Sequence, residues 1–94
     1  MKHALLIALL VIGMPAAAQA DCFAQYKAKQ DSPLRLHFGI ARLSGACPDR
    51  STAESQLRAR LAQGGWQLLN IVSLSPDEPG AKQKANAGEF YLRY

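Results

Sequence analysis

The sequence is poor in the residues with which small proteins carry out chemistry. It has 94 residues with two histidines, two cysteines and one tryptophan, and only His37 among the histidines lies beyond the first twenty residues. One histidine and scattered carboxylates do not form the converging ligand set that a metal needs. No glycine-rich phosphate loop is present, because Gly64-Gly65 follows a predicted helix instead of preceding one. We therefore expect no metal and no cofactor, and the sequence alone identifies no activity.

Charge is absent from residues 4–20, which follow a short basic start at Lys2. The small residues that end this run fit the positions that signal peptidase reads. We therefore expect residues 1–20 to be a secretory signal peptide, cleaved between Ala20 and Asp21. The mature chain is then periplasmic or secreted.

Two other interpretations of the N-terminus remain open. A membrane anchor would need roughly 20 strongly apolar residues, and this run is shorter and ends in Ala, Pro and Gln. A lipoprotein attached at Cys22 would need a small residue before the cysteine, where Asp21 stands. After cleavage we expect a single domain over residues 21–94, with no stable membrane insertion.

Cysteine is limited to Cys22 and Cys47. In an oxidising compartment, an even pair in a small exported domain predicts a structural disulfide. The loop that this bond closes is long enough for a stabilisation of about 3 to 4 kcal/mol. A redox-active pair is the alternative, but it normally needs close Cys-X-X-Cys spacing.

Basic residues outnumber acidic ones by 11 to 7, and the formal net charge is +4. The positive residues are scattered along the chain and separated by acids. A nucleic-acid-binding protein would concentrate them on one face, so we expect no nucleic-acid partner. A solvated, mildly basic surface is the simpler interpretation, and loose contact with anionic envelope lipids or polymers is the alternative.

Alternation of apolar and polar residues predicts a β-hairpin over residues 22–30 and 34–43. Asp31-Ser32-Pro33 supplies the turn. If the hairpin folds about Ser32, Cys22 lies near residue 42, and the disulfide ties the open end. On the second strand the predicted core face carries Leu34, Leu36, Phe38 and Ile40, and the predicted polar face carries Arg35, His37, Gly39 and Ala41.

A helix is predicted to follow, with Ser51 and Glu54 as a capping box or Asp49 as the cap. Its apolar stripe is narrow and consists of Ala53, Leu57 and Leu61. Gly64 suits the residue that ends such a helix.

The nearly continuous apolar run at residues 66–74 predicts a central strand. Its first residue, Trp66, is expected to anchor the core, although a partly exposed place in a ligand groove is the alternative. Residues 75–88 are expected to form a long mobile connection, and residues 89–94 a last strand beside 66–74.

This order predicts an α+β fold of ββαββ type, with a four-stranded, largely antiparallel sheet and one helix on one face. The predicted core consists of Leu34, Leu36, Phe38, Ile40, Leu57, Leu61, Trp66, Leu68 and Leu92.

Two functions are compatible with these features. The first is a non-enzymatic exported protein that acts as a protein-interaction or structural module. Its partner surface would be the last strand, at Tyr91, Arg93 and Tyr94, because an edge strand can add a strand of an envelope protein or of a second copy. In a variant of this hypothesis, the connection at residues 75–88 inserts into an envelope enzyme and inhibits it.

The second function is that of a small-ligand-binding or hydrolytic protein. It would use the polar sheet face around His37, Arg35 and Arg93, provided that these side chains converge. Without such convergence, His37 is a solvated strand residue.

Three segments carry a resemblance to known proteins: Tyr26-Lys27, residues 61–69 around Gly65-Trp66, and residues 90–93. Their order resembles a family of short bacterial domains of unknown function with a helix, Gly-Trp and strand pattern. The chain also resembles small exported proteins of unknown function from Gram-negative bacteria. Neither resemblance implies an activity or a functional residue.

Overall fold

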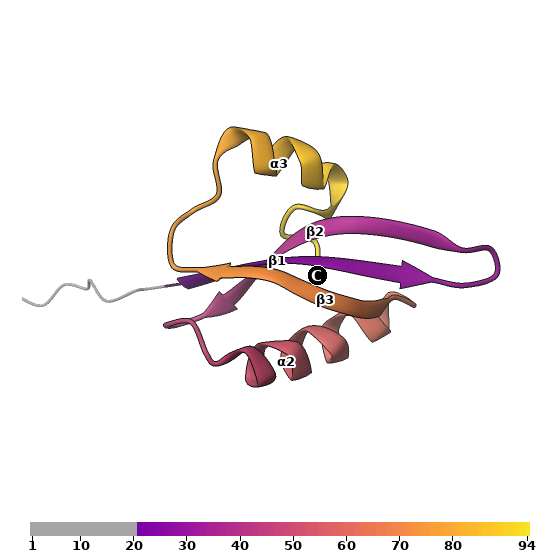
Figure 1. The fold of residues 1–94 in the computed structure, drawn as a ribbon, viewed down its shortest axis with the longest axis horizontal. Coiled ribbons are helices and arrows are strands. Elements are labelled where there is room, and N and C mark those ends of the chain that lie inside the picture. Colours follow the sequence, from indigo (N-terminus) through magenta and orange to yellow (C-terminus); the bar gives the residue numbers. More distant parts are fainter. Residues whose placement is uncertain (1–20) are drawn as a thin grey trace, which may run out of the picture.

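The computed structural model describes residues 21–94. The predicted signal peptide, residues 1–20, and Ala20 of its cleavage site lie outside the described residues. These residues form a three-stranded antiparallel sheet with strand order β2-β1-β3, and its two faces are covered by different helices (Figure 1). The elements are β1 (Asp21–Gln30), β2 (Arg35–Ser44), α2 (Arg50–Gln63), β3 (Gln67–Ser75), α3 (Ala81–Ala87) and the 3-10 turn η2 (Gly88–Phe90).

The predicted α+β class is confirmed, but the four-stranded sheet with one helix is wrong. Part of the supposed mobile connection is α3, whose sequence consists mostly of the good helix formers Ala, Lys and Gln. The last residues form η2 and a tail instead of a strand. This tail, residues 91–94, makes one bridge to β2 at Ile40, where the Leu92 amide donates to the Ile40 carbonyl at 2.7 Å. The central strand is β1, and β3 lies at an edge.

The hairpin register differs from the prediction by one residue. A four-residue loop joins β1 to β2, so Tyr26 lies opposite Gly39 and Cys22 opposite Leu43. A shift of one residue moves every side chain of a strand to the other face. The two faces of β2 are therefore exchanged: His37 is buried, whereas Leu36 is 66% exposed. Leu34 lies in the loop before β2 and is 65% exposed.

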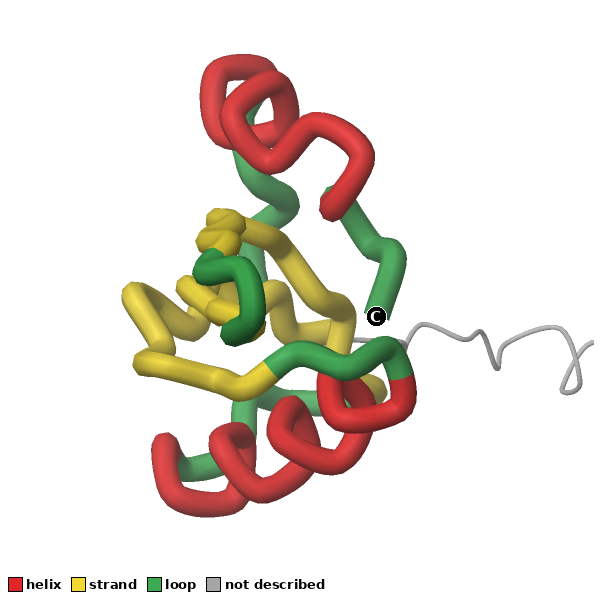
Figure 2. Tube along the Cα trace, turned by 90° about the vertical axis from the view of Figure 1, so that its right-hand side faces the viewer, coloured by secondary structure: helices red, strands yellow, loops and turns green. Residues whose placement is uncertain are grey.

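The core lies between the sheet and α2, on the face that β1 lines with Cys22, Ala24, Tyr26 and Ala28. The helix buries the predicted stripe of Ala53, Leu57 and Leu61. Figure 2 shows α2 lying along one side of the sheet, with α3 on the other. Five members of the predicted core are buried, namely Ile40, Leu57, Leu61, Trp66 and Leu68. Leu34 and Leu36 are exposed, and Phe38 and Leu92 are half-buried. Ile40 lies on the other face, which α3 partly covers.

The predicted disulfide between Cys22 and Cys47 is present. It joins the start of the central strand to the loop that leads into α2. That helix begins one residue before the predicted capping box, with Asp49 as its N-cap, so the box is not formed. Within residues 21–94 no helix has the length and apolar character that crossing a membrane would require.

Candidate functional site

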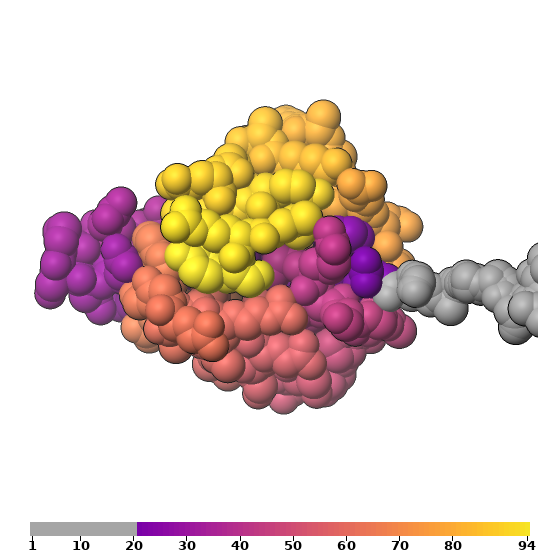
Figure 3. All heavy atoms as spheres, turned by 180° about the vertical axis from the view of Figure 1, so that it is seen from behind, coloured from indigo at the N-terminus to yellow at the C-terminus, as the bar shows by residue number. Residues whose placement is uncertain are grey.

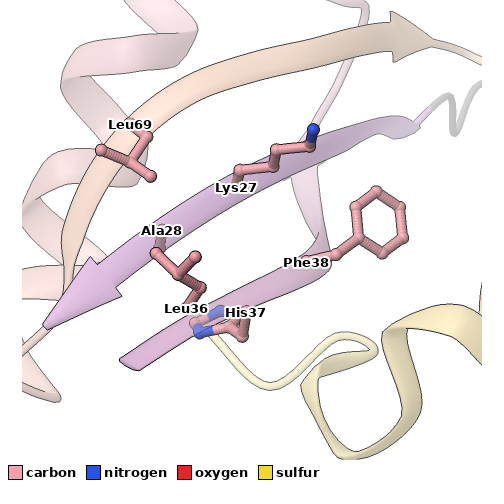
Figure 4. A pocket seen from close by; sticks show the side chains of 6 residues that line it. All are labelled: Lys27, Ala28, Leu36, His37, Phe38 and Leu69. Atoms are coloured by element: carbon pink, nitrogen blue, oxygen red, sulfur yellow. The ribbon is translucent and has the colours of Figure 1, made fainter. Parts of the chain in front are cut away.

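On the face of the sheet that α3 partly covers, the half nearest the hairpin loop has no helix over it (Figure 1), and we call this uncovered half the open face. There β1 and β2 place Lys27 opposite Phe38 and Lys29 opposite Leu36. A hollow of about 300 Å³ lies on this face. Its lining residues come from all three strands and are Lys27, Ala28, Leu36, His37, Phe38 and Leu69 (Figure 4).

The exposed apolar side chains of β3 lie at irregular positions of the strand. The pairing of β3 with β1 skips Leu69 and Val72, because two register shifts interrupt the ladder. Such bulges re-aim side chains and bend the strand. Leu69 is 48% exposed and Val72 44% exposed. With Leu34 and Leu36 they make up the exposed large hydrophobic residues of the described chain.

Lys27 is the only lysine or arginine among the residues that line the hollow. It lies on the central strand, between Phe38 on β2 and Asn70 on β3, and it is exposed. Within residues 21–94 no carboxylate forms an ion pair with it, whereas its neighbour Lys29 pairs with Asp31 at 3.5 Å. The open face therefore combines apolar side chains with one uncompensated positive charge.

His37 points to the opposite side of β2, into the core. Its ring stacks on Phe90 with 3.7 Å between ring centroids, and it meets the Trp66 ring edge-on at 4.3 Å. Its Nε2 is hydrogen-bonded to Tyr26 Oη at 2.9 Å. Only 8% of the residue is exposed, so the expectation of a solvated His37 is wrong.

Burial lowers the pKa of His37 to about 4, with a further contribution from Arg93 that Glu89 opposes. The same environment raises the pKa of Tyr26 to about 12, chiefly through burial. At neutral pH His37 is therefore uncharged. Its Nδ1 is buried and has no hydrogen-bond partner among the described residues. An imidazole enclosed by aromatic rings is a packing element of the core and reaches no substrate from this position.

The three residues proposed for ligand binding do not share a polar face. His37 is buried, and Arg93 is close enough to affect its pKa. Arg35 is exposed at the start of β2. Among residues 21–94 no three His, Cys, Asp or Glu side chains are grouped so that they could hold a metal.

The predicted partner surface lies on the C-terminal tail, which crosses the molecule below α3 (yellow in Figure 3). Tyr94 packs over the end of α2, where a Cβ atom on Gly64 would lie 2.6 Å from the Tyr94 ring. Tyr91 is half-buried beside β2, and Arg93 is exposed and pairs with Glu89 at 3.9 Å. A partner role for these residues stays a prediction, but the strand that was to carry them is absent from the described chain.

Sequence reasoning missed the open face. It could have been predicted from the alternation of β1, in which the disulfide cysteine Cys22 shares one face with Ala24, Tyr26 and Ala28. That set marks the core side of the central strand and leaves Lys27 on the other side. Comparison of the chain with protein-family models, with curated proteins and with solved structures found no match.

Proposed function

We propose that the protein is a non-enzymatic, exported module that binds a protein partner through the open face. The observation that carries this proposal is the group of large apolar side chains that stand exposed around one hollow, above all Leu36 and Leu69. Full burial of a large apolar side chain is worth roughly 1.5 to 3 kcal/mol, and a partner that covers these partly exposed leucines would recover part of that amount from each. A contiguous apolar patch on a small protein commonly marks an interaction site.

The face is better suited to a partner than either edge of the sheet. The C-terminal tail crosses the outer edge of β2 at Ile40. At the other side of the sheet, β3 is bent by the bulges in its pairing with β1, and Arg50 Nη1 donates to its Ile71 carbonyl at 2.7 Å. Bulges and occupied backbone groups both hinder the addition of a further strand. The side chains of the open face meet no such obstacle.

Export is supported by the disulfide, since such bonds persist in oxidising compartments. The uncharged run at residues 4–20 supports it independently. An enzymatic function has weaker support, because the single histidine of the described chain is buried and uncharged at neutral pH.

The test uses a photo-crosslinking amino acid placed at single positions of the full chain, expressed in a Gram-negative bacterium. We expect a discrete protein adduct from position 36 on the open face. The matched control is position 56 on α2, where Gln56 is also exposed but belongs to the helix that covers the other face of the sheet. The adduct should disappear when Leu69→Asp is added. Equal adducts from both positions, or no adduct from position 36, would contradict the proposal.

A further inference from the structure

The charge on the open face indicates the chemistry of the partner. Building on the proposed function, we infer that the partner contributes an apolar polypeptide segment with a carboxylate that pairs with Lys27. The apolar part of the segment would cover Leu36, Phe38 and Leu69, which line the hollow around this lysine.

The need for a carboxylate follows from the position of Lys27. It lies on the central strand, so a segment that covers the neighbouring leucines also covers the lysine stem and takes water from its ammonium group. A charge that loses water without gaining a partner is strongly unfavourable. None of the residues that line the hollow is acidic, and within residues 21–94 no carboxylate forms an ion pair with Lys27. The compensating group must therefore come from the occupant.

A second copy of the chain does not meet this requirement. Two open faces placed against each other would bring a Lys27 from each copy into the same apolar interface, and like charges at an interface are unfavourable. Such a dimer would add no new carboxylate from the hollow itself, because none of its lining residues is acidic.

A lipid surface and a single acyl chain also fit poorly. Binding to a membrane surface is strengthened by several Lys and Arg side chains beside the inserted apolar residues. Here Lys27 is the only lysine or arginine among the residues that line the hollow. A ligand site normally encloses most of its ligand, and this hollow is only partly enclosed. A peptide segment needs no such enclosure, because the rest of the partner excludes water from its outer side.

Selection from a displayed peptide library against the oxidised protein tests the inference. From the wild type we expect apolar peptides that contain Asp or Glu and that shift the NMR signals of the Leu36 and Leu69 methyl groups. Lys27→Glu should weaken these peptides at least tenfold and select peptides with Lys or Arg instead. Lys82→Glu changes the net charge equally on the exposed surface of α3 and should behave as wild type.

Each of the other outcomes contradicts either this inference alone or the proposed function as well. If peptides bind the open face without an acidic preference and Lys27→Glu has no effect, this inference fails and the proposed function stands. If no peptide shifts the open-face signals and position 36 gives no crosslink, both fail. If anionic vesicles or a fatty acid shift these signals and peptides do not, the occupant is an amphiphile and the inferred polypeptide partner is wrong.

Discussion

Gly39 is the residue that gives Tyr26 its place in the core. The two lie directly opposite each other on β2 and β1, and a Cβ atom at position 39 would lie 2.5 Å from Tyr26 Cζ. The tyrosine ring is fully buried and cannot move aside freely. We therefore expect Gly39→Ala to lower the free energy of unfolding by about 1 to 3 kcal/mol, as overpacked core sites do. Urea unfolding monitored by Trp66 fluorescence measures this loss.

A double-mutant cycle isolates the contact between these two side chains. In a Tyr26→Leu background the shorter side chain leaves room for the new methyl group. There Gly39→Ala should be neutral or slightly stabilising, since alanine restricts the unfolded strand more than glycine does. An equal loss of stability in both backgrounds would show that backbone conformation at position 39, and not the ring, is responsible.

At the scale of elements, periodicity was a sufficient guide where a single face is buried. The stripe of α2 and the two hairpin strands were predicted from it and are present. The buried face of β2 was not predicted correctly, because both sets of alternate residues contain apolar members. The length of the turn determines which of the two sets faces the core. A turn centred on Ser32 and the observed four-residue loop differ by one residue in register, and this difference moves His37 from the surface to the core.

The C-terminal elements could not be predicted because local and tertiary signals disagree there. Residues 81–87 have good helix-forming composition but bury only Ala87, so the sequence contains no apolar stripe from which α3 could be predicted. Residues 90–94 alternate like a strand, yet they pack through aromatic rings on His37 and over Gly64. Aromatic residues at alternate positions fit both arrangements, and only the surrounding structure selects one.

The attachment of this tail to the sheet should depend on pH through His37, whose ring stacks on Phe90. The imidazole accepts a proton near pH 6.5 when unfolded and near pH 4 when folded. Between these values the unfolded state binds more protons, so the free energy of unfolding falls as pH falls. This contribution is intact above pH 6.5 and is lost below pH 4, a total of about 3 kcal/mol. Urea unfolding at several pH values between 7 and 4 measures it.

The matched variant is His37→Gln, which cannot take up a proton in this range. Other groups also destabilise the fold in acid, among them Glu78, whose pKa is lowered by its hydrogen bond with Lys84. The informative quantity is therefore the difference between the two pH profiles. The wild type should lose more stability than the variant between pH 6.5 and 4. Parallel profiles would mean that His37 is solvated in solution.

For the whole molecule, the open face shows why a candidate site can escape sequence analysis. It depends on the register of the hairpin, on the bulges of β3 and on how far α3 extends over the sheet. None of these is encoded in a short motif. The residues that line the hollow are ordinary strand residues, and only their shared exposure distinguishes Leu36 and Leu69 from core leucines.

The disulfide should determine whether this small domain stays folded. Cys22 begins the central strand and is fully buried, and Cys47 precedes α2, so the bond joins the sheet to its helix. Closing this loop reduces the conformational entropy of the unfolded chain and so stabilises the folded state by about 3 to 4 kcal/mol. That is a large share of the free energy of unfolding of a typical domain, roughly 5 to 15 kcal/mol.

Reduction of the wild type should lower the free energy of unfolding by about 3 to 4 kcal/mol, measured by urea unfolding with and without dithiothreitol. The double variant Cys22→Ala, Cys47→Ala should be equally weak and insensitive to dithiothreitol. An unchanged stability on reduction would mean that residues 21–94 fold equally well without the bond. The disulfide would then no longer support the proposal that the protein is exported to an oxidising compartment.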